Sequence, residues 1–318
     1  MRYPFIMLLA MFAATPVQSQ QYPVRPVRMI VPFAPGGAVD VVARIAAVGM
    51  TETMKQQVVV DNRAGGGGVI GTDITVQARG DGYTLLLHSA AIASEPALRA
   101  KLPYDAMKDL APVTRVGVTP NLLVAHPAFV AKSARDLIAL AKEKPGIVTY
   151  GTGGVGSSSH LAVELFGILS GTRFNHVPFK GAGPAVTAVV AGELNFTIAP
   201  MPAAISHTRA GRLRALGVSG SKRSPAAADI PTIAETGLPG YEFVAWFGLL
   251  APAATPAKLV ERIASLVHAT VNAPDTRGKM ESQGFEPETN SPAEFRAHIL
   301  KETEKWRKVI TQAGIKAS

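Results

Sequence analysis

The stretch Val27-Arg-Met-Ile-Val-Pro-Phe-Ala-Pro-Gly-Gly-Ala-Val-Asp40 begins with a continuous apolar run and ends in a helical pattern. The run Val27–Val31 predicts a strand that is buried on both faces. Two prolines restrict the turn that follows, and Gly36-Gly37 permit positive φ angles and close approach by a ligand. We expect a helix from about Ala38, whose free N–H groups point into the turn and favour an anion such as a carboxylate.

Asp40 falls in the first turn of that helix. Its carboxylate either complements the positive end of the helix dipole or accepts hydrogen bonds from an amine or hydroxyl of a bound solute. The sequence leaves both roles open.

Short apolar runs alternate with helical patterns along most of the chain. This alternation is typical of βαβ units, so we predict an α/β fold with mainly parallel sheets flanked by helices. The expected strands are Val27–Val31, Val58–Val60, Thr84–Leu87, Leu122–Ala125, Val148–Tyr150, Phe174–Val177, Phe196–Ile198, Leu213–Val218 and Val244–Leu250.

Three helices have clear start signals. Ser133 is a predicted N-cap with Asp136 three residues later, and Thr255-Pro256 predicts a helix with proline at its first position. Ser291-Pro-Ala-Glu294 is a capping box that opens a last helix reaching about Ala313.

The length of 318 residues allows two cores of ordinary size. Two segments with the plan strand, glycine-rich turn and helix suggest two similar α/β domains. We place the chain crossings near Val116–Val124 and Tyr241–Phe247. The expected first domain is discontinuous, residues 20–120 and 241–318, and the second is residues 121–240. The crevice between them is the expected ligand cleft.

The N-terminus has the features of a signal peptide. Met1 and Arg2 give a positive start, Tyr3 to Ala14 is an apolar run, and small residues suit cleavage after Ser19. The run is too short to span a bilayer, although an uncleaved anchor is the alternative. We therefore expect residues 1–19 to be removed and the mature protein to be exported to the periplasm.

The formal net charge is +9, and loss of Arg2 with residues 1–19 leaves +8. Lysines and arginines are dispersed, and no aromatic residues alternate with them, so we expect no nucleic-acid partner. The positive balance favours solubility and attraction of anionic ligands. Cysteine is absent, which excludes disulfides, thiolate metal sites and cysteine nucleophiles.

Two glycine patterns require a nucleotide-linked α/β enzyme to be weighed as the alternative. Gly66, Gly68 and Gly71 satisfy G-x-G-x-x-G after a strand, as do Gly151, Gly153 and Gly156. Neither has the acidic residue about 20 positions later that binds ribose in dinucleotide sites. Arg63 and Lys180 are available for a phosphate, so the alternative stays open.

Other enzyme signatures are missing. Ser157, Ser158, Ser159 and His160 are adjacent, but the sequence has no G-x-S-x-G. The seven histidines show no metal-ligand spacing, and we expect most of them at the surface or at caps. We expect no catalytic residue, no metal site and no cofactor.

The ordered motifs of these loops resemble the Bug family, the extracytoplasmic solute receptors of tripartite tricarboxylate transporters. The resemblance covers about Tyr22 to Ile315. The motifs that carry it are Pro32–Asp40, Asp61–Gly65, Val177–Pro184, Ala210–Ala215, Asp229–Glu235, Gly237–Tyr241 and Ala245–Gly248.

The resemblance implies two α/β domains, in a fold like that of periplasmic binding proteins, that close over a small carboxylate, such as a di- or tricarboxylate, an amino acid or an aromatic acid. It implies a receptor, not an enzyme. Its partners would be the membrane subunits of a transporter, or a signalling partner for an orphan receptor, and we expect a monomer. Matched to this chain, the family's ligand loops point to Phe33, Ala34, Gly36, Gly37 and Asp40, to His88 and Ser89, and to Thr152, Gly153, Ser157, Ser158, Lys180, Gly181 and Pro184.

The chain departs from the family at two places. Thr187-Ala-Val-Val-Ala-Gly-Glu193 and Ala199-Pro-Met-Pro202 have apolar residues where many relatives have aspartates. This change favours a less polar acid. Lys180 either pairs with a ligand carboxylate or with an acidic residue at the domain edge.

Overall fold

β1 (Val27–Val31) is the central strand of a parallel set, between β2 (Val58–Asn62) and β3 (Thr84–Ser89). The computed structural model describes residues 22–99 and 101–313, so the predicted signal peptide lies outside the described residues. The other strands are β4 (Leu110–Ala125), β5 (Thr149–Thr152), β6 (Asn175–Pro178), β7 (Phe196–Pro200), β8 (Arg214–Val218), β9 (Val244–Pro252) and β10 (Glu286–Pro287).

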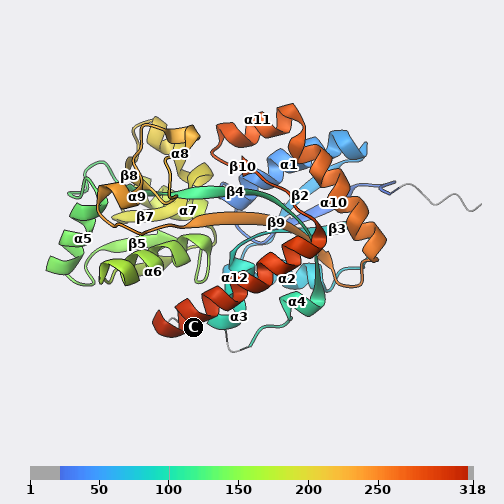
Figure 1. Cartoon of the computed structure of the whole chain (residues 1–318), viewed down its shortest axis with the longest axis horizontal. Coiled ribbons are helices and arrows are strands. Elements are labelled where there is room, and N and C mark those ends of the chain that lie inside the picture. Colours follow the sequence, from blue (N-terminus) through green and yellow to red (C-terminus); the bar gives the residue numbers. More distant parts are fainter. Residues whose placement is uncertain (1–21, 100, 314–318) are drawn as a thin grey trace, which may run out of the picture.

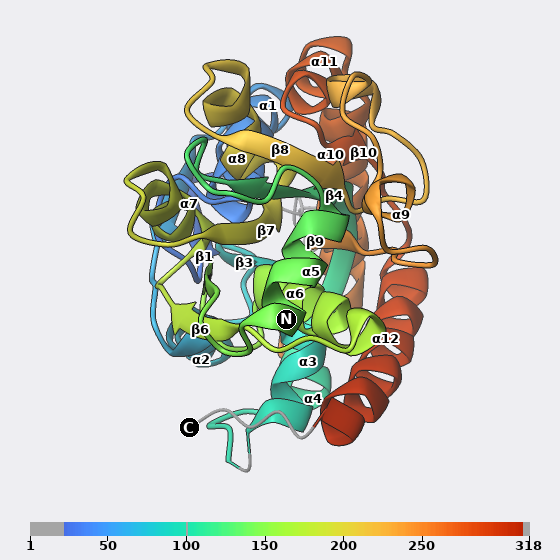
Figure 2. The same cartoon turned by 90° about the vertical axis from the view of Figure 1, so that its left-hand side faces the viewer.

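Helices cover both faces of the strands and complete the α/β fold (Figures 1 and 2). Two short 3₁₀ turns, η1 (Gly66–Gly68) and η2 (Pro225–Ala227), lie in loops. The α-helices are α1 (Ala38–Met54), α2 (Val69–Val76), α3 (Ala91–Leu98), α4 (Ala106–Asp109), α5 (Ala134–Glu143), α6 (Ser158–Ser170), α7 (Ala182–Val190), α8 (Met201–Arg209), α9 (Ile233–Thr236), α10 (Ala257–Asn272), α11 (Pro274–Ser282) and α12 (Pro292–Ala313).

The strands form two parallel groups joined by long antiparallel strands. The order is β2-β1-β3-β9-β4-β7-β5-β6, and β8 and β10 also pair with β4. β1, β2 and β3 are parallel, as are β5, β6 and β7, whereas β4 and β9 run antiparallel to their neighbours. Figure 1 shows β4 and β9 extending side by side across the molecule.

β4 changes partners along its length, and this change divides the molecule. Its residues 110–120 pair with β9, and its residues 121–125 pair with β7 and β8. The strands therefore form two sheets, one of β1, β2, β3, β9, β10 and the start of β4, and one of β5 to β8 and the end of β4. These sheets correspond to the two predicted domains, whose boundaries stay a prediction.

The sequence predicted only the last four residues of β4. The part before these four residues contains Pro112, Gly117 and Pro120; proline removes a ladder hydrogen bond, and glycine weakens a strand interior. The structure accommodates Pro112 and Gly117 at two shifts in the register with β9, and Pro120 pairs with Val244 where the β4–β9 ladder ends. The two-residue strand β10 was also missed.

The predicted helix starts agree with the structure to within one residue. Ser133 caps α5 by accepting a hydrogen bond from the Asp136 N–H, and Ser291 and Glu294 form the expected capping box before α12. Pro256, the predicted first helical residue, is the N-cap of α10, so this helix begins one residue later, at Ala257.

Ser219, directly after β8, ties the two crossing segments together. Its hydroxyl accepts a hydrogen bond from the Asn121 N–H at 2.6 Å and donates to the Phe243 carbonyl at 2.5 Å. Its own N–H donates to the Asn121 carbonyl, and its carbonyl accepts from the Phe243 N–H, both at 2.8 Å. One buried residue therefore bonds to both strands where they pass between the domains.

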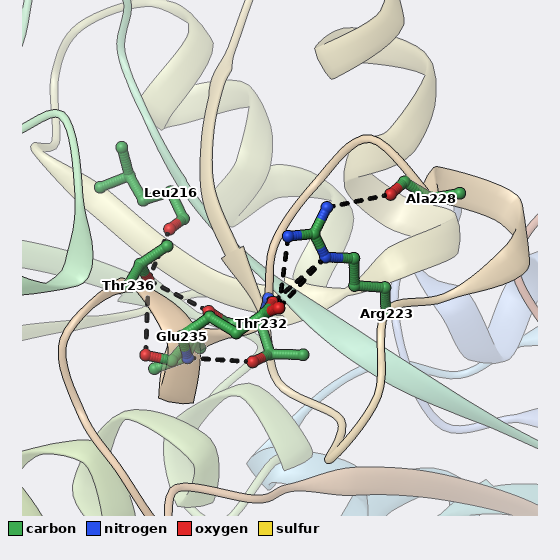
Figure 3. A network of polar contacts seen from close by, with 7 residues as sticks. Leu216, Arg223, Ala228, Thr232, Glu235 and Thr236 are labelled. Atoms are coloured by element: carbon green, nitrogen blue, oxygen red, sulfur yellow. Dashed lines mark hydrogen bonds and ion pairs between the residues drawn. The ribbon is translucent and has the colours of Figure 1, made fainter.

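The loop after Ser219 is fastened by a polar network (Figure 3). Thr232 and Glu235 form a capping box at the start of α9, and Arg223 donates to the Glu235 carboxylate at 3.2 Å. The Thr236 hydroxyl donates to the Leu216 carbonyl in β8 at 3.1 Å. These contacts hold the loop against the second domain close to the crossing.

A continuous apolar core extends from β1 and β3 through β9 to β5 and β7, including Ile30, Leu86, Phe247, Tyr150 and Phe196. A smaller cluster packs α7 and α8 against β4 and β7. Both cores leave the strand ends and the turns after them at the boundary between the domains.

Candidate ligand-binding site

A small cavity of about 20 Å³ lies between the domains, where turns that follow the strands meet. This volume holds about one water molecule, so an organic solute needs these walls to move apart. The first domain contributes Phe33, Gly37, Ala38, Val39, Ser89 and Phe247, and the second contributes Gly153, Ser157, Ser158, Ser159, Ala182 and Pro200.

The turn between β1 and α1 forms one wall. Gly36 has a φ of +84°, a left-handed conformation that favours glycine, and Gly37 is the N-cap of α1. No side chain caps α1, so the N–H groups of its first turn are free to bind a ligand.

The turn between β5 and α6 forms the facing wall with a group of hydroxyls. Ser157 caps α6 by accepting a hydrogen bond from the His160 N–H at 3.3 Å. Ser159 accepts from the Gly153 N–H at 2.9 Å, and the two serine hydroxyls lie 3.0 Å apart. Ser158 is the first residue of α6, so the cavity meets the positive end of a second helix.

α7 supplies a third helix start. Its N-cap is Gly181, with a φ of +150°, and no side chain caps it. A Cβ atom on Gly37 would lie 3.5 Å from the Ala182 nitrogen. The uncapped starts of α1 and α7 therefore face each other at close range.

The charge distribution of this cavity suits an anion. None of its lining residues has an ionisable side chain. The positive ends of three helices and the serine hydroxyls supply hydrogen-bond donors instead. Phe33, Val39, Pro200 and Phe247 form an apolar wall beside them. The arrangement can bind a carboxylate and pack against a carbon chain.

Comparison with known proteins agrees with this geometry. The family model described as "Tripartite tricarboxylate transporter family receptor" matches residues 42–315. The chain belongs to this family. BugT of Bordetella pertussis is 40% identical over 305 residues, which cover 95% of this chain and 94% of BugT. The protein is therefore a solute-binding receptor, and the family is one of periplasmic receptors, not enzymes.

Solved structures of periplasmic binding proteins share the two-domain fold of this receptor. Rpa4515 of R. palustris, described with adipate, has a TM-score of 0.89 and 35% identity over 93% of this chain and 99% of its own. MatC of Rhodopseudomonas palustris, described with bound malate, has a TM-score of 0.86 and 30% identity over 91% of this chain and all of its own. BugD has a TM-score of 0.89 and 29% identity over 93% of this chain.

Several residues predicted for the receptor's site join the loops outside the cavity lining. The Ala34 N–H donates across the domain boundary to the Lys180 carbonyl at 2.8 Å, and the Lys180 side chain is exposed. A Cβ atom on Gly181 would lie 3.1 Å from the Ala34 nitrogen. Gly36 and Pro184 line a separate outer groove. These residues place the backbone of the β1–α1 turn in contact with the backbone of the loop between β6 and α7.

Asp40 is buried, and its carboxylate braces the β1–α1 turn. It accepts hydrogen bonds from the Gly36 N–H, the Asn62 amide and the Arg44 guanidinium, each at 3.0 Å. Burial acts to raise its pKa, but the bonds from Arg44, Gly36 and Asn62 outweigh burial and hold the pKa below its ordinary value. The contacts give Asp40 a positioning role, and a ligand contact stays a prediction.

His88 and Thr152 lie behind the cavity wall. The His88 ring is fully buried, with Nδ1 2.9 Å from the Ser89 carbonyl and Nε2 3.5 Å from the Glu95 carboxylate. The Thr152 hydroxyl lies 2.6 Å from His176 Nε2. Both residues support neighbours that line the cavity, Ser89 and Gly153.

Two stacked histidines support the β5–α6 turn, although the sequence placed most histidines at the surface or at caps. The His160 and His176 rings stack with centroids 4.3 Å apart, and His160 Nδ1 accepts a hydrogen bond from the Gly156 N–H at 3.1 Å. Burial lowers the pKa of His160 to about 4. Burial, and secondarily the charge of His160, lowers that of His176 to about 4. Both rings are therefore neutral at neutral pH.

The glycine patterns that suggested a nucleotide allow close packing in the receptor. A Cβ atom on Gly71 would lie 2.7 Å from Cα of Pro32. Gly67 is not a motif glycine, but a Cβ atom on it would lie 2.7 Å from the Val155 carbonyl in the other domain. One on Gly151 would lie 2.8 Å from the Leu194 side chain. The G-x-G-x-x-G matches arise because these turns pack against neighbours.

Sequence reasoning missed six lining residues: Ala38, Val39, Ser159, Ala182, Pro200 and Phe247. Four of them lie next to predicted site residues or helix starts: Ala38, Val39, Ser159 and Ala182. Extending each predicted loop into the first turn of the helix that follows would have included them. Pro200 follows the predicted strand Phe196–Ile198 by two residues. Phe247 lies within an apolar strand and gave no separate signal.

None of the helices in the described part of the chain combines the length and apolarity needed to span a bilayer. Within residues 22–99 and 101–313, His, Asp and Glu side chains form no group of three or more able to hold a metal ion.

Proposed function

We propose that this receptor captures a small dicarboxylate with an aliphatic carbon chain and closes its two domains around it. The observation that carries the proposal is the cavity lined by helix starts and hydroxyls without an ionisable side chain. Carboxylate oxygens would accept hydrogen bonds from the N–H groups of α1 and α7 and from the serines at the start of α6. The carbon chain would pack on Phe33, Val39, Pro200 and Phe247.

The absence of an acidic lining residue favours solutes without an ammonium group. A buried ammonium needs a carboxylate or several acceptors, and this cavity wall offers no carboxylate. The relatives described with adipate and malate, which carry no amine, support the same class. The two apolar positions where many family members have aspartates agree with this selectivity.

Domain closure would form the contacts that now cross the boundary. The Ala34 N–H donates to the Lys180 carbonyl, and the Ser94 hydroxyl donates to the Gly156 carbonyl at 3.0 Å. We propose that these bonds break in an open state and that the crossing segments beside Ser219 bend. The proposed domains are residues 20–120 with 241–318, and residues 121–240, which the change of partners along β4 supports.

The receptor would deliver its solute to membrane subunits of a tripartite transporter, or signal if it is an orphan. We propose that it is exported with cleavage after Ser19 and acts as a monomer in the periplasm. The mass of protein recovered from its native periplasm tests the cleavage, and sedimentation tests the monomer.

Titration calorimetry with adipate, malate and 2-aminoadipate tests the solute class. Adipate and 2-aminoadipate have the same chain and carboxylates, so their difference isolates the ammonium. We expect adipate to bind at least about tenfold more tightly, because the added charge would be buried without a partner. Equal affinities, or preference for the amino acid, would refute the proposed selectivity.

A further inference from the structure

His160, in the first turn of α6, directly follows the three serines that line the cavity. It is itself buried and is not part of the cavity lining. The serines are Ser157, Ser158 and Ser159, and all three are buried as well. Contacts that fix His160 therefore also fix the backbone that carries these hydroxyls.

His160 bonds to two adjacent residues of the β5–α6 turn. Its backbone N–H donates to the Ser157 hydroxyl oxygen at 3.3 Å, and its ring Nδ1 accepts from the Gly156 N–H at 3.1 Å. The Gly156 carbonyl accepts a hydrogen bond from the Ser94 hydroxyl of the first domain at 3.0 Å. His160 thus holds both the hydroxyl that caps α6 and the glycine that contacts the other domain.

The bond from Gly156 determines which ring nitrogen of His160 carries the proton. A backbone N–H can only donate, so Nδ1 must present a lone pair, and the proton of the neutral ring lies on Nε2. Nε2 is 3.6 Å from Oε1 of Glu164, and the same oxygen accepts the Tyr150 hydroxyl at 2.6 Å. The Glu164 carboxylate therefore stabilises the tautomer that the turn requires.

The surroundings of the His160 ring keep it uncharged. The ring of His176 in β6 stacks on it, and Glu164 of α6 and Tyr150 of β5 complete this titratable cluster. Burial lowers the pKa of His160 to about 4, so the Nδ1 lone pair is retained at neutral pH. A proton on Nδ1 would place two N–H groups face to face and break the bond to Gly156.

We propose that His160 is a positioning residue of the solute site. Its Nδ1 lone pair holds the Gly156–Ser157 turn in the conformation that presents the serine hydroxyls to a carboxylate, and Glu164 fixes the tautomer that supplies this lone pair. The inference rests on the proposed function in one respect, namely that the solute carboxylate binds at this turn. His160 acts through the turn and does not contact the solute.

Two substitutions at position 160 separate the hydrogen-bond acceptor from the ring. Asparagine has an oxygen bonded to Cγ, as histidine has Nδ1, so His160→Asn can still accept from the Gly156 N–H, whereas His160→Leu cannot. In titration calorimetry, His160→Leu should weaken adipate binding about tenfold or more, and His160→Asn should stay within about threefold of the parent. Parent affinity in His160→Leu would overturn the proposal. Equal losses in both variants would assign the effect to ring packing and would also overturn it.

Nitrogen-15 spectra test the tautomer and the Gly156 bond without any solute. At neutral pH the parent should have a protonated Nε2 and an unprotonated Nδ1 in His160, and a protonated Nδ1 would overturn the proposal. The Gly156 amide should exchange with solvent about tenfold faster in His160→Leu than in His160→Asn.

The control is the Thr172 amide, which bonds to the Gly167 carbonyl at the other end of α6 and should not change. Equal acceleration of both amides would reveal a general loss of stability and contradict a specific role at the turn. If the parent failed to bind adipate, only the proposed solute class would be refuted, because these spectra do not involve the solute.

Glu164→Gln and Glu164→Leu test the residue that fixes the tautomer. Glutamine keeps an oxygen that can accept from His160 Nε2 and from Tyr150, so Glu164→Gln should bind adipate within about threefold of the parent. Glu164→Leu removes both acceptors; it should raise the fraction of His160 with a protonated Nδ1 and weaken adipate binding about fivefold. The Glu164 side chain is 30% exposed, so leucine has room at this position. An unchanged tautomer in Glu164→Leu would overturn the role assigned to Glu164.

Discussion

Replacing Gly37 by valine tests whether the uncapped starts of α1 and α7 hold the carboxylate. A Cβ atom at position 37 would lie 3.5 Å from the Ala182 nitrogen and 3.6 Å from the Gly183 nitrogen. These are ordinary contact distances, so the protein can fold around the new side chain. However, its methyl groups would occupy the space in which a carboxylate must approach the same N–H groups to about 2.9 Å.

The magnitude follows from the bonds that would be lost. Hydrogen bonds to a charged group contribute about 1.5–3 kcal/mol each, so losing two costs about 3–6 kcal/mol. This corresponds to a rise in Kd of about 10²- to 10⁴-fold. Gly37 has a φ of −84° and a ψ of 168°, an extended conformation open to any residue, so the melting temperature of the unliganded protein should change little.

Calorimetry with adipate measures the affinity, and thermal unfolding without ligand checks the fold. Gly278→Val is the matched control, because a Cβ atom at Gly278 in α11 would contact nothing within 4 Å. If Gly37→Val bound adipate within about threefold of the parent, the carboxylate would not lie between these helix starts.

Three further predictions concern the support of the site. Ser219→Ala leaves the buried Asn121 N–H without its acceptor, so the free energy of unfolding measured in urea titrations should fall by about 1–3 kcal/mol. The control Ser221→Ala, at an exposed position, should not lower it. Equal effects of the two substitutions would show that Ser219 does not link the crossing segments. Gly67 and Gly211 both have a left-handed φ, +69° and +68°, but only Gly67 faces another backbone across the domain boundary. Gly67→Ala should therefore weaken adipate binding, and Gly211→Ala should not. An equal loss of affinity in both variants would refute a role of Gly67 in closure. Burial lowers the pKa of His160 from 6.5 to about 4, so between these pH values only the unfolded chain takes up a proton at this residue. The free energy of unfolding should therefore be highest above pH 6.5 and fall by up to ~3 kcal/mol as the pH drops to about 4. His160→Gln should weaken this pH dependence, and an unchanged pH profile would contradict the assignment to His160.

Periodicity and turn residues predicted much of the fold, and the family resemblance pointed to half of the cavity lining. The strand at Val27–Val31, the glycine turn after it and the cap at Ser133 depend on local backbone preferences, which a sequence displays directly. The family resemblance pointed to Phe33, Gly37, Ser89, Gly153, Ser157 and Ser158, which line the cavity, and their contact with a ligand stays a prediction.

The remaining features depend on contacts distant in sequence. The first part of β4 contains prolines that look like strand breakers, and only its pairing with β9 makes the strand visible. His160 and His176 lie 16 positions apart in the chain, so no local pattern shows that their rings stack. Phe247 reads as an ordinary core residue because its strand is apolar throughout.

The uncharged cavity wall has a consequence for the kinetics of capture. The mature chain would have a formal charge of +8, which is +9 less Arg2, and that charge lies outside the cavity. Long-range attraction of an acid therefore comes from the outer surface, and retention comes from the helix ends inside. Salt screens the long-range attraction over about 8–10 Å, but it screens the buried contacts with the helix ends far less. Rising ionic strength should thus slow association while the residence time of the bound acid stays nearly constant.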